Sequence, residues 1–131
     1  MKAAGVRYVT AVQTTSYYGW DNSFTTETTR KHPDWATGIC TLDPDDPESG
    51  ALLENYVKHY NVRGLRSYPA ISIRLVDQGV ETLWARAEKL GIVVNVLANR
   101  DMKKEIRQMS NRHPGLPIVL DHCLNLKAGP E

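Results

Sequence analysis

An ionisable pair, Asp121-His122, directly follows the apolar segment Leu116–Leu120 near the C-terminus. In alternating β/α folds the side chains that perform acid–base chemistry lie where a strand ends. Of the four histidines, only His122 falls at such a place. We therefore take Asp121 and His122 as candidate catalytic residues. The other interpretation is a structural hydrogen bond, because polar groups buried at a strand end must be satisfied anyway.

Further polar side chains follow the other strand-like segments. The candidate substrate-binding residues among them are Gln13, Asp21, Asn22, Arg66 and Asn95. Hydrogen-bonding groups around one cation favour an anionic or carboxylated small molecule as ligand. An ion-paired or surface arginine is the alternative for Arg66. The nearby aromatic side chains of Tyr17, Tyr18 and Trp20 would either stack on a ligand or pack under a loop.

The remaining histidines belong elsewhere. His32, His59 and His113 each come at the end of a helix-like segment, beside other cations and just before the next strand. We expect exposed or capping side chains there, on the face opposite to the candidate site, and no metal ligands. The sequence also contains no HExxH, CxxC, phosphate-binding glycine loop or serine nucleophile elbow.

Apolar segments and amphipathic segments alternate along the chain. The strand-like segments are residues 6–13, 35–42, 62–68, 92–97 and 117–121, and the helix-like segments are residues 22–31, 47–60, 77–91 and 101–112. This order predicts an α/β fold of alternating βα units, with a parallel sheet of about five strands and four helices. No linker or composition shift divides the chain, so we expect a single domain over residues 1–131.

Composition narrows the function classes. The chain is 41% hydrophobic and 24% charged, with a net charge of +1, which gives no electrostatic case for nucleic acid or acidic lipid. No apolar run reaches the roughly 20 residues of a membrane span, and the first residues lack the apolar region of a signal peptide. Cys40 and Cys123 have no metal-type spacing. We expect small, buried, reduced thiols and a cytoplasmic protein.

Several motifs in their order resemble one known family. They are Tyr18-Gly19-Trp20-Asp21-Asn22-Ser23, His32-Pro33-Asp34, Val62-Arg63-Gly64-Leu65-Arg66, residues 83–92 (LWARAEKLGI) and Ile118-Val119-Leu120-Asp121-His122. From about Val6 to Leu124 the chain resembles the amidohydrolase-related family, which includes 2-pyrone-4,6-dicarboxylate lactonase and related lactonases and decarboxylases.

The resemblance implies a (β/α)8 barrel hydrolase in which a water, activated by a metal or an aspartate, attacks a lactone or similar carbonyl. Arg66 would hold a substrate carboxylate, and His122 would bind the substrate or polarise its carbonyl. A divalent metal such as zinc is possible in the family. The family's His-x-His strand and its final aspartate have no counterpart in this sequence, and Asn95 stands where the family often has a histidine.

The resemblance thus places the chain over the middle of the barrel, as a partial TIM barrel. Five strands cannot close a barrel that typically takes about 250 residues. We expect either an open, flattened sheet or a homo-oligomer that covers the exposed face. Two further functions stay open at this point. One is an inactive partial barrel that binds a small ligand or partner chain, and the other is a flavodoxin-like module with Asp43 in its acidic cluster.

Overall fold

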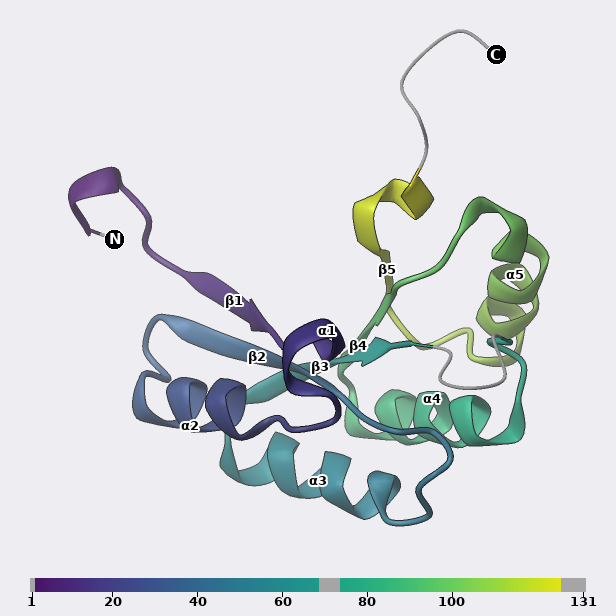
Figure 1. Ribbon diagram of the computed structural model, residues 1–131, viewed down its shortest axis with the longest axis horizontal. Helices are drawn as coiled ribbons and strands as arrows, with labels where there is room; N and C mark the ends of the chain where they lie inside the picture. The colour runs from purple at the N-terminus through teal and green to yellow at the C-terminus, as the bar shows by residue number, and fades with distance from the viewer. Residues whose placement is uncertain (1, 69–73, 126–131) are drawn as a thin grey trace, which may run out of the picture.

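The computed structural model describes residues 2–68 and 74–125, which form alternating strands and helices (Figure 1). The strands are β1 (Val9–Val12), β2 (Ala36–Thr41), β3 (Val62–Ser67), β4 (Val93–Val96) and β5 (Ile118–Leu120). The principal helices are α2 (Ser23–Lys31), α3 (Ser49–His59), α4 (Gln78–Leu90) and α5 (Lys103–Arg112). Each of these lies within or next to a segment that the sequence predicts.

Short helical turns complete the described chain. A fifth α-helix, α1 (Thr15–Tyr18), follows β1, and single-turn 3-10 segments occur at η1 (Lys2–Ala4), η2 (Arg100–Met102) and η3 (Asp121–Asn125). The prediction of four helices is therefore one short. Helix α1 has only four residues, and such a turn leaves no apolar periodicity in the sequence.

The five strands are all parallel and stand in the order β1-β2-β3-β4-β5. Successive right-handed crossovers between neighbouring strands place every connecting helix on the same face of a sheet. Figure 1 shows α2, α3 and α4 along that face. The order differs from the 2-1-3-4-5 order of flavodoxin-like folds, which excludes that alternative.

The sheet is a curled half-barrel, so the expectation of a flattened sheet is wrong. Strands twist by nature, and helices on one face only allow the twist to accumulate as curvature. Side chains of neighbouring strands pack closely over the inner side of β3 at Gly64. A Cβ on Gly64 would lie 2.9 Å from Val93 Cγ1 and 3.1 Å from Ile39 Cγ1, so neighbouring side chains fill the space above this glycine.

The core lies between the sheet and its helices. Leu65 of β3 and Val94 of β4 are buried against Leu53 of α3 and Trp84 of α4. The Trp84 Nε1–H donates to Ser67 Oγ at 2.9 Å, which satisfies the indole inside this core. Because strand side chains alternate, the residues between these core positions point to the opposite, inner face.

Within residues 2–68 and 74–125, the principal helices α2, α3 and α4 leave that inner face uncovered. Val12 of β1 and Val119 of β5 lie on it and remain 37% and 47% exposed. They pair in register with Ile39 and Asn95, so they continue the rows of inner side chains to both edges of the sheet. An apolar face between two edge strands is the surface that a closed barrel would bury.

The two cysteines differ in burial. Cys40 is buried, and burial raises the pKa of its thiol to about 12. Cys123 is exposed, so the expectation that it is buried is wrong, because η3 carries it past the end of the sheet.

No helix within the described ranges combines the length and hydropathy needed to cross a lipid bilayer.

Candidate active site at the carboxyl ends of the strands

The candidate site is built on an ion pair between β3 and the residue that follows β5. Arg66 Nε donates to Asp121 Oδ2 at 3.0 Å, and Asn95 Nδ2 donates to Asp121 Oδ1 at 3.1 Å. Arg66 and Asn95 are direct partners in the β3–β4 register, which places both side chains on the inner face. Three of the predicted site residues therefore form one cluster that ties β3, β4 and β5 together.

The cluster is largely buried. The side chains of Arg66 and Asp121 are only 12% and 14% exposed, so water screens their attraction less than at a surface. Arg66 Nη1 also approaches the backbone oxygen of Gln13 at 3.4 Å, which extends the contact to β1. Arg66 is therefore ion-paired, as one of its two interpretations held. It also lies at the carboxyl ends of the strands, where the other interpretation, a ligand-binding cation, would place it.

Two buried acceptors at the site have no partner among the described residues. They are Gln13 Oε1 and Asn95 Oδ1. Their amide orientations are fixed, since Gln13 Nε2 donates to the Gly19 and Asp21 carbonyls and Asn95 Nδ2 donates to Asp121. An unpartnered buried oxygen costs about 1–3 kcal/mol, so the site carries polar groups that the fold itself does not satisfy.

The loop after β1 is held by side chains that sequence analysis assigned to ligand binding. Asn22, 1% exposed, donates from Nδ2 to the Trp20 and Thr41 carbonyls and accepts the Thr41 N–H on Oδ1. Asp21 is exposed, and its Oδ1 accepts both the N–H and the hydroxyl of Ser23. These two bonds lower the pKa of Asp21 and hold the start of α2.

Thr41 is the residue that sequence analysis missed. It ends β2, is fully buried, and its Oγ1 donates to the Gln13 backbone oxygen at 3.2 Å. Together with its two backbone bonds to Asn22, this links the ends of β1 and β2. The available signal was a small polar residue near the end of the predicted strand 35–42.

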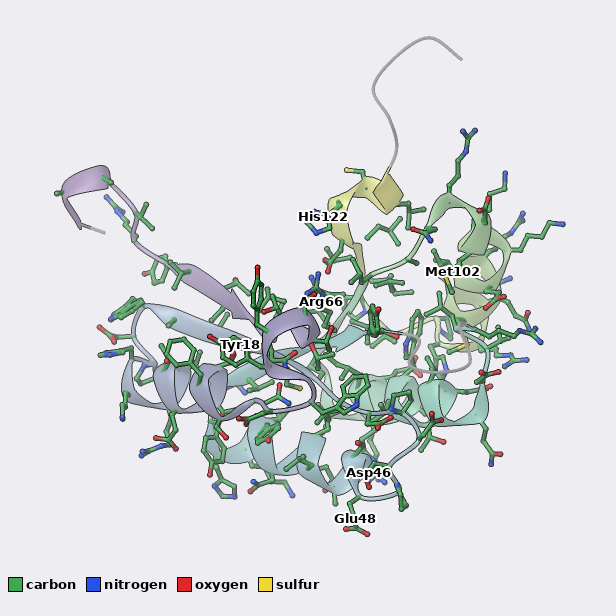
Figure 2. All side chains as sticks on the ribbon, in the orientation of Figure 1. Tyr18, Asp46, Glu48, Arg66, Met102 and His122 are labelled. Atoms are coloured by element: carbon green, nitrogen blue, oxygen red, sulfur yellow. The ribbon has the colours of Figure 1, made fainter. Side chains whose placement is uncertain are left out.

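His122 directly follows the buried cluster and is exposed on the side of the sheet away from α2, α3 and α4, which we call the open side (Figure 2). It begins a run of left-handed residues, His122, Cys123 and Leu124, with φ of 51°, 50° and 59°. A left-handed conformation costs a non-glycine residue roughly 1–2 kcal/mol. Strained residues of this kind are enriched at functional sites, and His122 is exposed to solvent.

The other polar and aromatic candidates separate by position. Tyr17, Tyr18 and Trp20 are 86%, 51% and 36% exposed, so they do not pack under a loop. Tyr18 instead stacks on Phe24 of α2. Asp43 accepts the Asp45 N–H on its carboxylate and the Ser49 hydroxyl on its backbone oxygen, which are the bonds of a turn.

The three other histidines end helices at the opposite side of the sheet, as expected. His32 and His113 cap α2 and α5, and His59 is the last residue of α3. His113 is buried, with Nδ1 3.0 Å from Glu88 Oε2, and Glu88 Oε1 also accepts the Gly115 N–H. These bonds lower the pKa of Glu88 and join α4 to the segment that enters β5.

The described side chains do not fit a divalent metal. Over residues 2–68 and 74–125 no three His, Cys, Asp or Glu side chains gather closely enough to hold one. The acidic group of the cluster, Asp121, faces the Arg66 cation instead.

The fold has counterparts among solved structures. A candidate 2-pyrone-4,6-dicarboxylic acid hydrolase from Acinetobacter baumannii, with citric acid bound, superposes with a TM-score of 0.77 over 96% of this chain at 19% identity. A candidate enzyme of the same description from Pseudomonas putida gives 0.72 over 92% at 25% identity. A 5-carboxyvanillate decarboxylase from Sphingomonas paucimobilis gives 0.67 over 92% at 17% identity.

This chain spans less than half of each neighbour, at 46%, 43% and 48% of their lengths respectively. No curated protein matches it in sequence. The family model described as amidohydrolase matches residues 1–129, which is nearly the whole chain. On this match, and with the half-barrel of parallel strands, the chain belongs to the amidohydrolase family.

Proposed function

We propose that this chain forms the carboxylate-binding part of an active site that hydrolyses a lactone or a similar carboxylated small molecule. The observation that carries the proposal is the hydrogen bonding of the three guanidinium nitrogens of Arg66. Its Nε is bonded to Asp121, Nη1 has one long contact with Gln13, and Nη2 has no hydrogen bond to the residues described. N–H groups on both Nη atoms are therefore left to donate, side by side, to the two oxygens of a carboxylate.

His122 is the residue that would act on the reacting group. It follows the cluster directly and its side chain is exposed on the open side. A neutral or charged imidazole there would donate to the carbonyl oxygen of a substrate whose carboxylate is held by Arg66. Gln13, Asp21, Asn22 and Asn95 would support this site through the loop and the ion pair that they hold.

The family neighbours make carboxylated substrates a reasonable choice, since their names refer to a pyrone dicarboxylate and a carboxyvanillate. The chain covers under half of their length. Both carboxylate oxygens of Asp121 already accept hydrogen bonds, so we assign activation of the attacking water to groups outside the cluster, and give the described residues binding and carbonyl polarisation.

The test uses 2-pyrone-4,6-dicarboxylate as substrate and citrate as a tricarboxylate probe. Ring opening is followed by the loss of pyrone absorbance, and citrate binding by calorimetry. Arg66→Ala should weaken citrate binding by at least about tenfold, the effect of losing ~1.4 kcal/mol. His122→Ala should lose turnover and keep citrate binding.

Arg63→Ala is the matched control, because Arg63 lies on the same strand but is exposed and bonds the Val57 carbonyl. Its citrate affinity should equal that of the unmodified chain. Binding without turnover would favour the alternative function, an inactive partial barrel that binds a small ligand. If the unmodified chain shows no citrate binding and no turnover, the proposal is refuted.

The same proposal includes a homo-oligomer. A second copy that packs on the inner face would bury Val12 and Val119 and cover the open edges of β1 and β5. The mass of the particle in solution tests this separately from the chemistry.

A further inference from the structure

Asp121 has a geometry that suits holding another residue better than reacting. Each of its carboxylate oxygens accepts a hydrogen bond, Oδ2 from Arg66 Nε and Oδ1 from Asn95 Nδ2. Its side chain is 14% exposed, and the two donors come from adjacent, register-paired positions on β3 and β4. The carboxylate therefore bridges two strands from the end of a third.

This bridge determines how Arg66 faces the open side. A hydrogen bond from Nε–H to a carboxylate fixes the plane of a guanidinium group, because the Nε–H lies in that plane and the plane turns about the Cδ–Nε bond. With Nε fixed at 3.0 Å from Asp121, the Nη atoms can no longer rotate independently of the sheet. The long Nη1 contact to the Gln13 oxygen restricts the same plane from the β1 side.

We propose that Asp121 is a positioning residue, which holds the Arg66 guanidinium in the orientation that presents its two Nη atoms to a substrate carboxylate. This inference rests on the proposed function of Arg66 and adds a residue to it. A preformed fork loses less conformational entropy when the ligand binds, so Asp121 contributes to affinity without touching the ligand. Asn95 acts one step further away, by holding Asp121.

The first arm of the test needs no ligand. The Arg66 Nε–H resonance is observed by ¹⁵N NMR of the 131-residue chain and assigned by its absence in Arg66→Lys. A hydrogen-bonded Nε–H exchanges slowly with water and is visible near neutral pH. We expect the resonance in the unmodified chain and in Glu27→Gln, which breaks the exposed Arg30–Glu27 pair instead. It should disappear in Asp121→Asn.

The second arm measures citrate affinity and, as a neutral comparison, affinity for triethyl citrate. Asp121→Asn should weaken citrate binding about tenfold, or ~1.4 kcal/mol, and leave the neutral ester unchanged. Asn95→Ala should weaken it by a smaller factor and serves if Asp121→Asn does not fold. Where turnover is measurable, Asp121→Asn should raise KM with little change in kcat.

The outcomes separate the two proposals. If the resonance is sensitive to Asp121 but the unmodified chain does not bind citrate, the orientation of Arg66 by Asp121 stands and the proposed function fails. If citrate binds and neither Asp121→Asn nor Asn95→Ala changes the resonance or the affinity, the positioning role is refuted. Equal loss of affinity for citrate and for the ester refutes it too, since that is the result of general structural damage. Loss of kcat at unchanged KM refutes it in favour of direct catalysis.

Discussion

At the scale of single residues, the candidate site separates into groups that face outward and groups that hold the loops. His122 is exposed and Arg66 keeps Nη2 without a hydrogen bond to the residues described, whereas Asn22 is bonded at both ends of its amide. An asparagine that pairs with the free backbone groups at a strand end has a structural role, because it satisfies groups that would otherwise be buried without partners. This predicts different consequences for substitutions that sequence analysis would group together.

Asn22→Ala should destabilise the chain by about 2–4 kcal/mol, because it leaves the buried N–H and C=O of Thr41 without partners. Urea unfolding followed by circular dichroism measures this change. Gln108→Ala, an exposed amide on α5, is the control and should shift stability by less than about 0.5 kcal/mol. Equal effects in the two variants would contradict the structural role of Asn22.

At the scale of elements, close packing on the inner face of the sheet depends on Gly64 of β3. Gly64→Ala would place a methyl group 2.9 Å from Val93 Cγ1 and should destabilise by about 1–3 kcal/mol. Gly50→Ala is the matched control. It lies in α3 with its nearest neighbour at 3.8 Å, so the same change should stabilise by about 0.5–1 kcal/mol. Thermal unfolding of the pair gives both signs, and a neutral Gly64→Ala would show that the inner face is loosely packed.

The connection between α4 and β5 predicts a dependence on pH. Bonds from His113 and Gly115 lower the pKa of Glu88 from 4.5, so the folded chain keeps this carboxylate ionised where the unfolded chain begins to protonate it. The stabilisation is present above about pH 4.5 and is lost as the pH falls through the lowered value.

Glu88→Gln should therefore lower the urea midpoint at pH 7 and show a shallower loss of stability towards pH 3. Glu48→Gln, an exposed carboxylate that Figure 2 labels near α3, should follow the unmodified chain at both pH values. Parallel pH curves for Glu88→Gln and the unmodified chain would rule out this role for Glu88.

The elements themselves follow closely from the sequence, and the reason is physical. Apolar runs such as residues 92–97 and the stripe through Leu83 and Trp84 report burial directly, and burial determines strands and helices. The partners of Asp121 could not be predicted in this way, because they depend on strand register and on rotamers. The left-handed turn at His122 could not be predicted either, since no glycine marks it.

At the scale of the whole molecule, the open half-barrel predicts association. Light scattering coupled to size exclusion should give a mass that is a multiple of 14.7 kDa. Val119→Lys, on the inner face of β5, should shift the mass towards a single copy and leave circular dichroism unchanged. A single-copy mass for the unmodified chain at high concentration would refute the homo-oligomer.

The strand order has one more consequence, which concerns how the fold opens. Each βα unit packs mainly on its immediate neighbours, as repeats do in a solenoid, so free energy is distributed along a line from β1 to β5. Opening should then begin at the two ends and progress inward, with amide exchange fastest in β1 and β5 and slowest in β3. The ion pair between Asp121 and Arg66 joins the end of β5 to β3, two strands away, and should therefore slow the opening of β5.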